Sequence, residues 1–207
     1  MYSIPMSLVD YLPVLFFGAA ALILQRDLYN KMSKGAFSLF CAGTIDVFMA
    51  GFLKASYKLL YAAGVCDFKP LSQLFFPLQA LGFMLAGIAL ICLVTRPQGK
   101  TMYAAAAPAV FSGTFVFVAL MVLGLLGVDV GMSVIAKKMK KPAVIILFVI
   151  SFIFSLMMGY LSAKDFSQSY MNWVAEGVNV IGQFSLFMGV LILDKAGLKD
   201  FMLKGDE

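Results

Sequence analysis

The sequence predicts an all-α, polytopic integral membrane protein with six transmembrane helices. Of the 207 residues, 62% are hydrophobic and 13% are charged, and the mean hydropathy is +0.94. A soluble domain carries about a quarter charged residues, whereas here the charges fall mainly between long apolar runs, as expected when lipid is the solvent. We therefore expect a single transmembrane domain over residues 1–207, divisible into halves 1–100 and 101–207, and no soluble domain.

Six apolar segments are each close to the ~20 residues that cross a bilayer. They cover about residues 8–24, 36–62, 71–94, 105–128, 142–161 and 172–193. Because a bilayer offers no water to backbone polar groups, each segment should be helical. Pro70 and Pro142 suit a first helical turn, where a missing N–H costs little. Two interpretations of the end of the fourth segment are kept. Gly131, Val134 and Ile135 could extend the helix, or they could form an interfacial turn.

The basic residues give a prediction for orientation. Six spans would place both termini on one face, together with eight lysines: Lys69, Lys137, Lys138, Lys140, Lys141, Lys195, Lys199 and Lys204. The other face would carry six basic residues: Arg26, Lys31, Lys34, Arg96, Lys100 and Lys164. The positive-inside rule then places both termini in the cytoplasm of a multi-pass cell-membrane protein. The net charge of +5 fits loops that face anionic headgroups rather than nucleic acid.

Two short matches between the halves suggest an internal repeat. The stretch from Lys31 to Ala36 (KMSKGA) resembles the stretch from Lys138 to Ala143 (KMKKPA), and each leads into the middle helix of a half. A pattern of Gln, Phe and Met that begins at Gln79 recurs at Gln183, in the third helix of each half. Three spans per half would place the halves in opposite orientation, as in the inverted three-plus-three repeats of many transporters.

Several function classes lack the residues that they require. The chain has no histidine, which removes the commonest proton shuttle and metal ligand. The three cysteines, Cys41, Cys66 and Cys92, lie far apart and predict no disulfide framework. We find no catalytic triad, phosphate-cradling loop or paired acids at hydrolase-like spacing. The sequence therefore predicts no catalytic residue, metal site or cofactor, and it favours a function other than catalysis.

The second segment contains the polar residues on which the functional prediction depends. Asp46, Ala50, Lys54 and Lys58 recur every four residues, so on a helix they form a drifting stripe. A mid-segment acid is expensive in lipid and normally faces a partner or a cavity. At about 1.5 Å per residue, Asp46 lies about 15 Å into the hydrocarbon core. Lys54 and Lys58 lie toward the other end of the second segment from Asp46. Asp10, at the start of the first segment, should lie at that same membrane face and could pair with Lys54 or Lys58.

Amides on two other helices reach a similar depth. Gln79 in the third segment and Asn179 and Gln183 in the sixth should lie near the plane of Asp46. Glu176 shares a helix face with the last two, in a first turn where the helix dipole also favours an acid. The predicted substrate-binding residues are therefore Asp46, Gln79, Asn179, Gln183, Lys54 and Glu176. Lone amides in membrane helices also serve as interhelical contacts, which is the structural alternative.

The resulting functional prediction is a membrane transporter, or a membrane-embedded binding protein, for a small polar or cationic solute. The expected partners are the lipid bilayer, the small-molecule solute, and a second copy or a larger transporter complex. The alternative is a non-transporting signalling or assembly subunit that works through small-residue helix faces such as that of Gly43 and Gly51. A third class, a lipid-modifying enzyme, would use Asp46 and Lys54.

Overall fold

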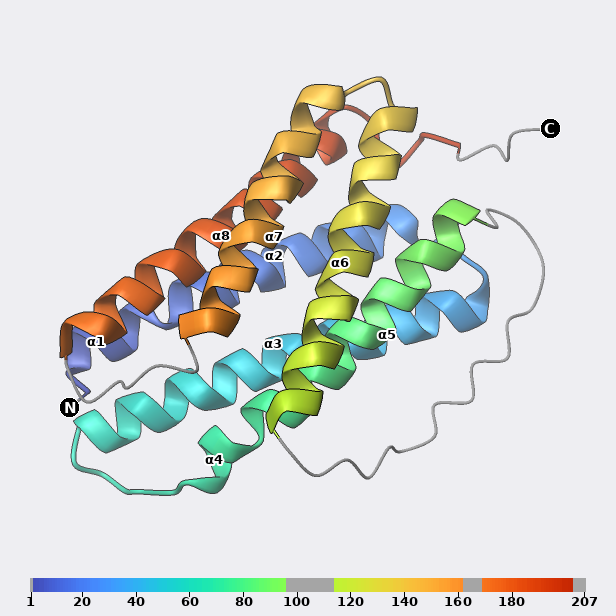
Figure 1. Ribbon diagram of the computed structural model, residues 1–207. Coiled ribbons are helices and arrows are strands. Elements are labelled where there is room, and N and C mark those ends of the chain that lie inside the picture. Colours follow the sequence, from blue (N-terminus) through green and yellow to red (C-terminus); the bar gives the residue numbers. More distant parts are fainter. Residues whose placement is uncertain (1, 96–113, 162–168, 203–207) are drawn as a thin grey trace.

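The computed structural model describes residues 2–95, 114–161 and 169–202, and all the regular secondary structure in these ranges is helical (Figure 1). The prediction of six helices long and apolar enough to span a membrane is confirmed for this part of the chain. The elements are α1 (Ile4–Val9), α2 (Tyr11–Leu28), α3 (Lys34–Ala62), α4 (Pro70–Gln73), α5 (Phe75–Thr95), α6 (Thr114–Lys138), η1 (Pro142–Val144), α7 (Ile145–Leu161) and α8 (Ser169–Lys195).

The helix ends follow local sequence signals. Ser33 caps α3, and its hydroxyl accepts a hydrogen bond from the Ala36 N–H at 3.3 Å, which satisfies one of the free donors of a first turn. Pro70 and Pro142 occupy the first positions of α4 and η1, as their missing N–H groups favour. Gly64, after α3, adopts a positive φ of 69°, a conformation that costs glycine little.

The fourth helix differs from the predicted segment 105–128. Helix α6 begins at Thr114 and continues through Asp129 to Lys138. Gly131, Val134 and Ile135 therefore extend the helix and do not form an interfacial turn. Residues 105–113 lie outside the described part of the chain. The acid at position 129 therefore sits inside a helix instead of marking its end. Hydropathy placed the end there because a charged residue normally interrupts an apolar span.

Neighbouring helices contact one another in the order α2, α3, α5, α6, α7, α8, and α8 returns to α2. The pairs α2/α3, α3/α5 and α7/α8 are antiparallel. For example, Gly43 lies against Ala86, whereas the later residue Val47 lies against the earlier residue Gly82. Short connections between consecutive helices favour such antiparallel neighbours.

The pair α5/α6 is parallel. A Cβ atom on Gly87 would lie 2.5 Å from the carbonyl oxygen of Gly124, and Gly131 lies against Leu90, further along both helices. The pair α2/α8 is also parallel, because Phe16 contacts Phe184 and Phe187 while Arg26, later in α2, pairs with Asp194. Figure 1 shows α5 and α6 rising side by side from the same end of the bundle.

These directions correct two expectations. The helices α2, α3 and α5 run in the same three directions as α6, α7 and α8, so the described halves are parallel and not inverted. Tyr2 and Met202 consequently lie toward opposite ends of the bundle, not on one face (Figure 1). The prediction failed because it assumed that successive spans alternate in direction, and α5 and α6 do not.

We call the two ends of the bundle the basic end, where Lys31, Lys140 and Lys199 lie, and the cavity end, where Tyr2 and Ser72 lie. The half nearer the basic end holds a dense apolar core. Members with exposed fractions of 0–4% include Leu24, Leu28, Leu90, Leu93, Met132, Ile135, Leu193 and Leu198. The other half contains the cavity described next.

Candidate functional site

A cavity of about 350 Å³ occupies the half of the bundle nearer the cavity end. Its lining comes from α2 to α8, and its inner boundary is formed by Phe17, Val47, Phe83 and Leu125. The polar residues that line it are Tyr2, Asp10, Lys54, Lys58, Ser72, Gln79, Ser155, Asn172, Glu176, Asn179 and Gln183. Pockets for small molecules are mostly apolar with a few convergent polar groups, and this volume lies within their usual range.

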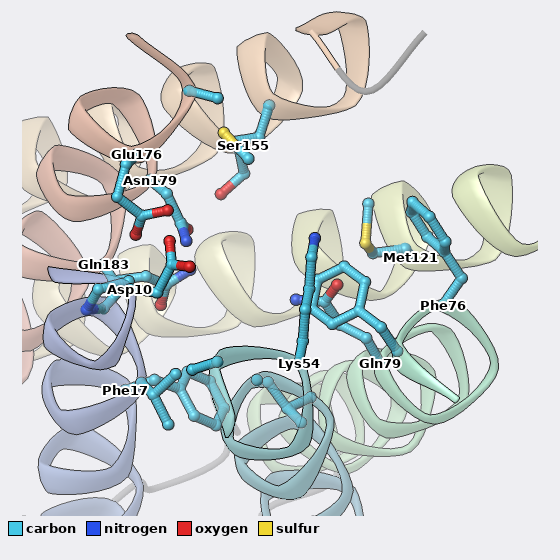
Figure 2. A pocket seen from close by; sticks show the side chains of 18 of the residues that line it. Asp10, Phe17, Lys54, Phe76, Gln79, Met121, Ser155, Glu176, Asn179 and Gln183 are labelled. Carbon is cyan, nitrogen blue, oxygen red and sulfur yellow. The ribbon is translucent and has the colours of Figure 1, made fainter. Parts of the chain in front are cut away.

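Two acids and one lysine form the most buried charge cluster of the cavity. The Lys58 Nζ lies 2.6 Å from a carboxylate oxygen of Asp10 and 4.0 Å from one of Glu176. The side chains of Lys58, Asp10 and Glu176 are only 14%, 6% and 7% exposed, and the two carboxyl groups face one another (Figure 2). One ammonium therefore faces two carboxyl groups, and oxygens of Asp10 and Glu176 are buried without a hydrogen bond of standard geometry among the described residues.

Lys54 points into the same cavity from α3 (Figure 2). Its Nζ lies 3.7 Å from the centroid of the Phe75 ring and 6.0 Å from that of Phe76. Aromatic faces attract cations without neutralising them, and Lys54 forms no ion pair within the described residues. Lys54 is thus a positive charge that faces the cavity and remains available to an anionic group.

Amides supply hydrogen-bonding groups along the walls. Gln79 lines the wall formed by α5, and Asn179 and Gln183 line the wall formed by α8 (Figure 2). The buried carbonyl oxygen of Gln183 has no hydrogen-bond partner among the described residues, and an unsatisfied buried acceptor costs about 1–3 kcal/mol. A bound solute that donates a hydrogen bond would recover that energy.

Asp46 does not join this cluster. It does not line the cavity, and it forms no ion pair within the described part of the chain. It is half-buried, next to the exposed Ile45 and Met49. Each four-residue step overshoots a full helical turn by about 40°, so a stripe that starts at Asp46 has turned by about 80° when it reaches Lys54. Asp46 therefore lies outside this cavity, whose acidic lining residues are Asp10 and Glu176.

The other predicted residues do come together. Lys54, Gln79, Glu176, Asn179 and Gln183 all line the cavity. The pairing of Asp10 with Lys58, one of the two options that the sequence allowed, is formed, but neither residue stood among the predicted site residues. The signal was present, since Asp10 and Lys58 are acid and base at one end of adjacent antiparallel helices. Of the described residues, no group of three or more Cys, Asp or Glu side chains is arranged to hold a metal ion.

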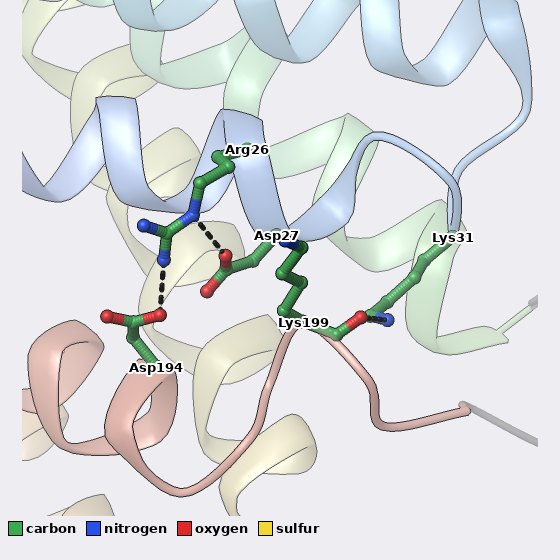
Figure 3. A network of polar contacts seen from close by, with 5 residues as sticks. All are labelled: Arg26, Asp27, Lys31, Asp194 and Lys199. Atoms are coloured by element: carbon green, nitrogen blue, oxygen red, sulfur yellow. Dashed lines mark hydrogen bonds and ion pairs between the residues drawn. The ribbon is translucent and has the colours of Figure 1, made fainter.

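The basic end is closed by a polar cluster that joins α2 to α8 (Figure 3). The Arg26 Nε lies 2.8 Å from Asp27, whose side chain is fully buried, and the same guanidinium pairs with Asp194. Beside them, the Lys31 ammonium donates a hydrogen bond of 2.6 Å to the carbonyl oxygen of Lys199. Partial burial lowers the pKa of Lys31, and the carboxylates of Asp200 and Asp27 oppose that effect. We call Arg26, Asp27 and Asp194 the α2–α8 ion cluster.

The fold and site together define an all-helical bundle whose cavity lies toward one end and whose other end is closed by apolar packing and ion pairs. Comparisons with protein-family models, with curated proteins and with solved structures give no match to this chain.

Proposed function

We propose that the protein spans a membrane and binds a small polar solute in this cavity as a step in carrying it across. The observation that carries the proposal is the one-sided cavity of about 350 Å³ with ionic groups on its walls. Two acids and two lysines line it, namely Asp10, Glu176, Lys54 and Lys58. Because these charges balance, the site suits a zwitterion or another neutral polar solute better than the cationic solute that Asp46 alone would favour.

The outer surface supports residence in a membrane. Large apolar side chains on the outside of the long helices have exposed fractions of 45–69%, among them Leu15, Leu22, Ile45, Leu123, Ile146 and Phe184. Soluble monomers rarely expose contiguous apolar area on this scale. A lipid environment would cover these side chains, and the backbone groups in the interior of the long helices find most of their hydrogen-bond partners within the same helix.

The distribution of charge supports one orientation. Nine basic residues of the described chain lie at the basic end: Arg26, Lys31, Lys34, Lys137, Lys138, Lys140, Lys141, Lys195 and Lys199. The half nearer the cavity end has three, Lys54, Lys58 and Lys69, of which the first two line the cavity. The positive-inside rule then places the basic end in the cytoplasm and directs the cavity to the opposite side. The N-terminus would lie outside and the C-terminus inside.

This arrangement fits a transporter in the state that faces away from the cytoplasm. Parallel repeats related by an axis along the membrane normal are one known plan of transporters, in which the site lies between halves that rock against each other. The halves contact each other through two parallel pairs, α5/α6 and α2/α8. The close glycine contacts between α5 and α6 favour an interface that stays in place as the halves move. The α2–α8 ion cluster favours an interface that can break and reform.

The assembly-subunit alternative has less support. It requires small-residue faces that remain free for a partner. A Cβ atom on Gly43 would lie 2.4 Å from the Gly82 carbonyl oxygen, and one on Gly51 would lie 2.9 Å from Val14. These faces are therefore occupied within the chain. A second copy or a larger complex would have to bind through other surfaces.

The test is solute-induced stabilisation of the purified protein in lipid nanodiscs, since a ligand stabilises the state that binds it. The probes are zwitterionic amino acids, choline as a cation and acetate as an anion. We expect a zwitterion to raise the unfolding temperature of the wild type and of Asp46→Asn, and to have no effect on Lys54→Met or Glu176→Gln. A successful probe is then tested for uptake into proteoliposomes. Stabilisation that disappears in Asp46→Asn but survives in Lys54→Met would contradict the proposal.

A further inference from the structure

Asp129 is a buried acid that the solute cavity does not use. It lies inside α6, is 4% exposed, and does not line the cavity. Both carboxylate oxygens are buried without a hydrogen-bond partner of standard geometry in the described residues. Buried polar groups are nearly always satisfied, so an exception of this kind calls for an explanation in terms of strain, function or a bound species.

No counter-charge is available to Asp129 from the described elements that pack against its helix. These elements are α5, η1 and α7, and none of them contains Lys, Arg, Asp or Glu. The nearest cations on its own helix, Lys137 and Lys138, follow two turns later at the basic end. An ionised carboxylate in such surroundings would be far less stable than a carboxyl group that holds a proton.

The polar neighbour of the Asp129 carboxyl group is the hydroxyl of Ser151 on α7, which is 1% exposed. Ser155 follows one turn later on the same face of α7 and lines the cavity. Gly182 of α8 packs against this stretch of α7, because a Cβ atom there would lie 3.2 Å from the Phe154 Cβ and 3.6 Å from the Ser151 carbonyl oxygen. Ser151 beside Asp129 and Ser155 in the cavity wall are therefore two hydroxyl-bearing positions between the acid and the cavity.

We propose that Asp129 is a proton-binding site that exchanges its proton with the cavity along Ser151 and Ser155. In the step itself, the carboxylate takes a proton from a hydronium ion in the cavity, which leaves a carboxylic acid and a water molecule, and the reverse step returns that proton to water as hydronium. A proton fits this site better than a metal cation does, because Na⁺ or Ca²⁺ needs several oxygen ligands at once. The described surroundings add one hydroxyl to the carboxyl group.

Proton binding at Asp129 stands without the proposed transport function, whereas its use as a driving force rests on that function. If the protein is a transporter, a proton held at Asp129 would be lost or gained as the halves rearrange. Carboxyl groups in membrane helices commonly mark such proton relays. The experiment is therefore chosen to report on the proton directly and needs no solute.

The test is infrared difference spectroscopy of the full chain in lipid nanodiscs, titrated from about pH 5 to about pH 9, the range in which buried carboxyl groups titrate. We expect a protonated-carboxyl carbonyl band that disappears reversibly as the pH rises. The band should be absent in Asp129→Asn and shifted in frequency in Ser151→Ala. The matched control, Asp200→Asn, removes an exposed acid at the basic end and should leave the band unchanged.

Two results would overturn the proposal. The first is the absence of any carbonyl band that depends on Asp129 over the whole range, which would mean an ionised carboxylate. The second is a band that persists unchanged at both limits, which would mean a permanently neutral structural group that exchanges no proton. Because Asn occupies nearly the same volume as Asp, loss of folding is not expected, and circular dichroism of each variant verifies it. Failure of the solute test would leave these results unaffected.

Discussion

Gly87 of α5 and Gly124 of α6 are in backbone contact, and a Cβ atom on Gly87 would lie 2.5 Å from the Gly124 carbonyl oxygen. The helices meet there while running in the same direction. Small residues allow such close approach, and the energy of association comes from the contact of the two backbones. This seam joins the two halves of the chain and fixes their parallel arrangement.

The first prediction concerns this seam. Gly87→Ala should destabilise the protein by about 1–3 kcal/mol, because the added methyl group must displace a backbone and not a flexible side chain. The control is Gly177→Ala on α8, where a Cβ atom meets no other atom within 4 Å and where alanine should be neutral or stabilising by up to about 1 kcal/mol. Thermal unfolding in detergent compares the two variants. Equal stability of both would show that α5 and α6 are further apart than described.

The second prediction concerns the buried ion cluster of the cavity. Lys58→Met removes the cation that faces Asp10 and Glu176, and should cost about 3–5 kcal/mol because it leaves buried acids without compensation. The double variant Lys58→Met with Asp10→Asn should recover part of the loss. Lys69→Met is the control, since that lysine is 70% exposed and lies 3.9 Å from Asp67, and exposed pairs contribute little. Denaturant or thermal unfolding measures all three, and a double variant no more stable than Lys58→Met would contradict the pairing.

The third prediction concerns orientation in the membrane. Cys66 is exposed near the cavity end, so a membrane-impermeant thiol reagent should label it from outside intact cells when Cys41 and Cys92 are replaced by Ser. A cysteine at Lys140, introduced into a chain without other cysteines, should react only after the cells are opened. Protection of Cys66 together with labelling at position 140 would show that the protein is inserted the other way round.

The fourth prediction concerns the α2–α8 ion cluster. Asp194→Asn removes the pairing between Arg26 and the end of α8, so the closed end should open more often. Thiol modification of a single cysteine placed at Leu24, which is 4% exposed, should become several-fold faster. Global stability should change little, because the Arg26 side chain is 53% exposed and exposed pairs contribute little. Asp200→Asn serves as the control. An unchanged rate of thiol modification in Asp194→Asn would show that the α2–α8 ion cluster does not control opening of the basic end.

Much of the site could be predicted from depth along the helices. Gln79, Asn179 and Gln183 were placed at one level from the rise per residue, and all three line the cavity. Asp46 was assigned by the same reasoning but lies outside, because depth does not determine which side of a helix faces inward. The sequence does not identify Asp129 as a buried residue, because the segment predicted from hydropathy ends at residue 128, just before it.

The sequence by itself determined that this chain forms long apolar helices and where most of them begin and end. Those properties follow from local propensities, prolines, caps and the apolar content of each segment, which act within about 20 residues. The tertiary structure alone decided that the halves run parallel, that Asp10 and not Asp46 enters the cavity, and that Asp129 is enclosed. These properties depend on which helix faces meet across the bundle, and such contacts join residues far apart in the chain.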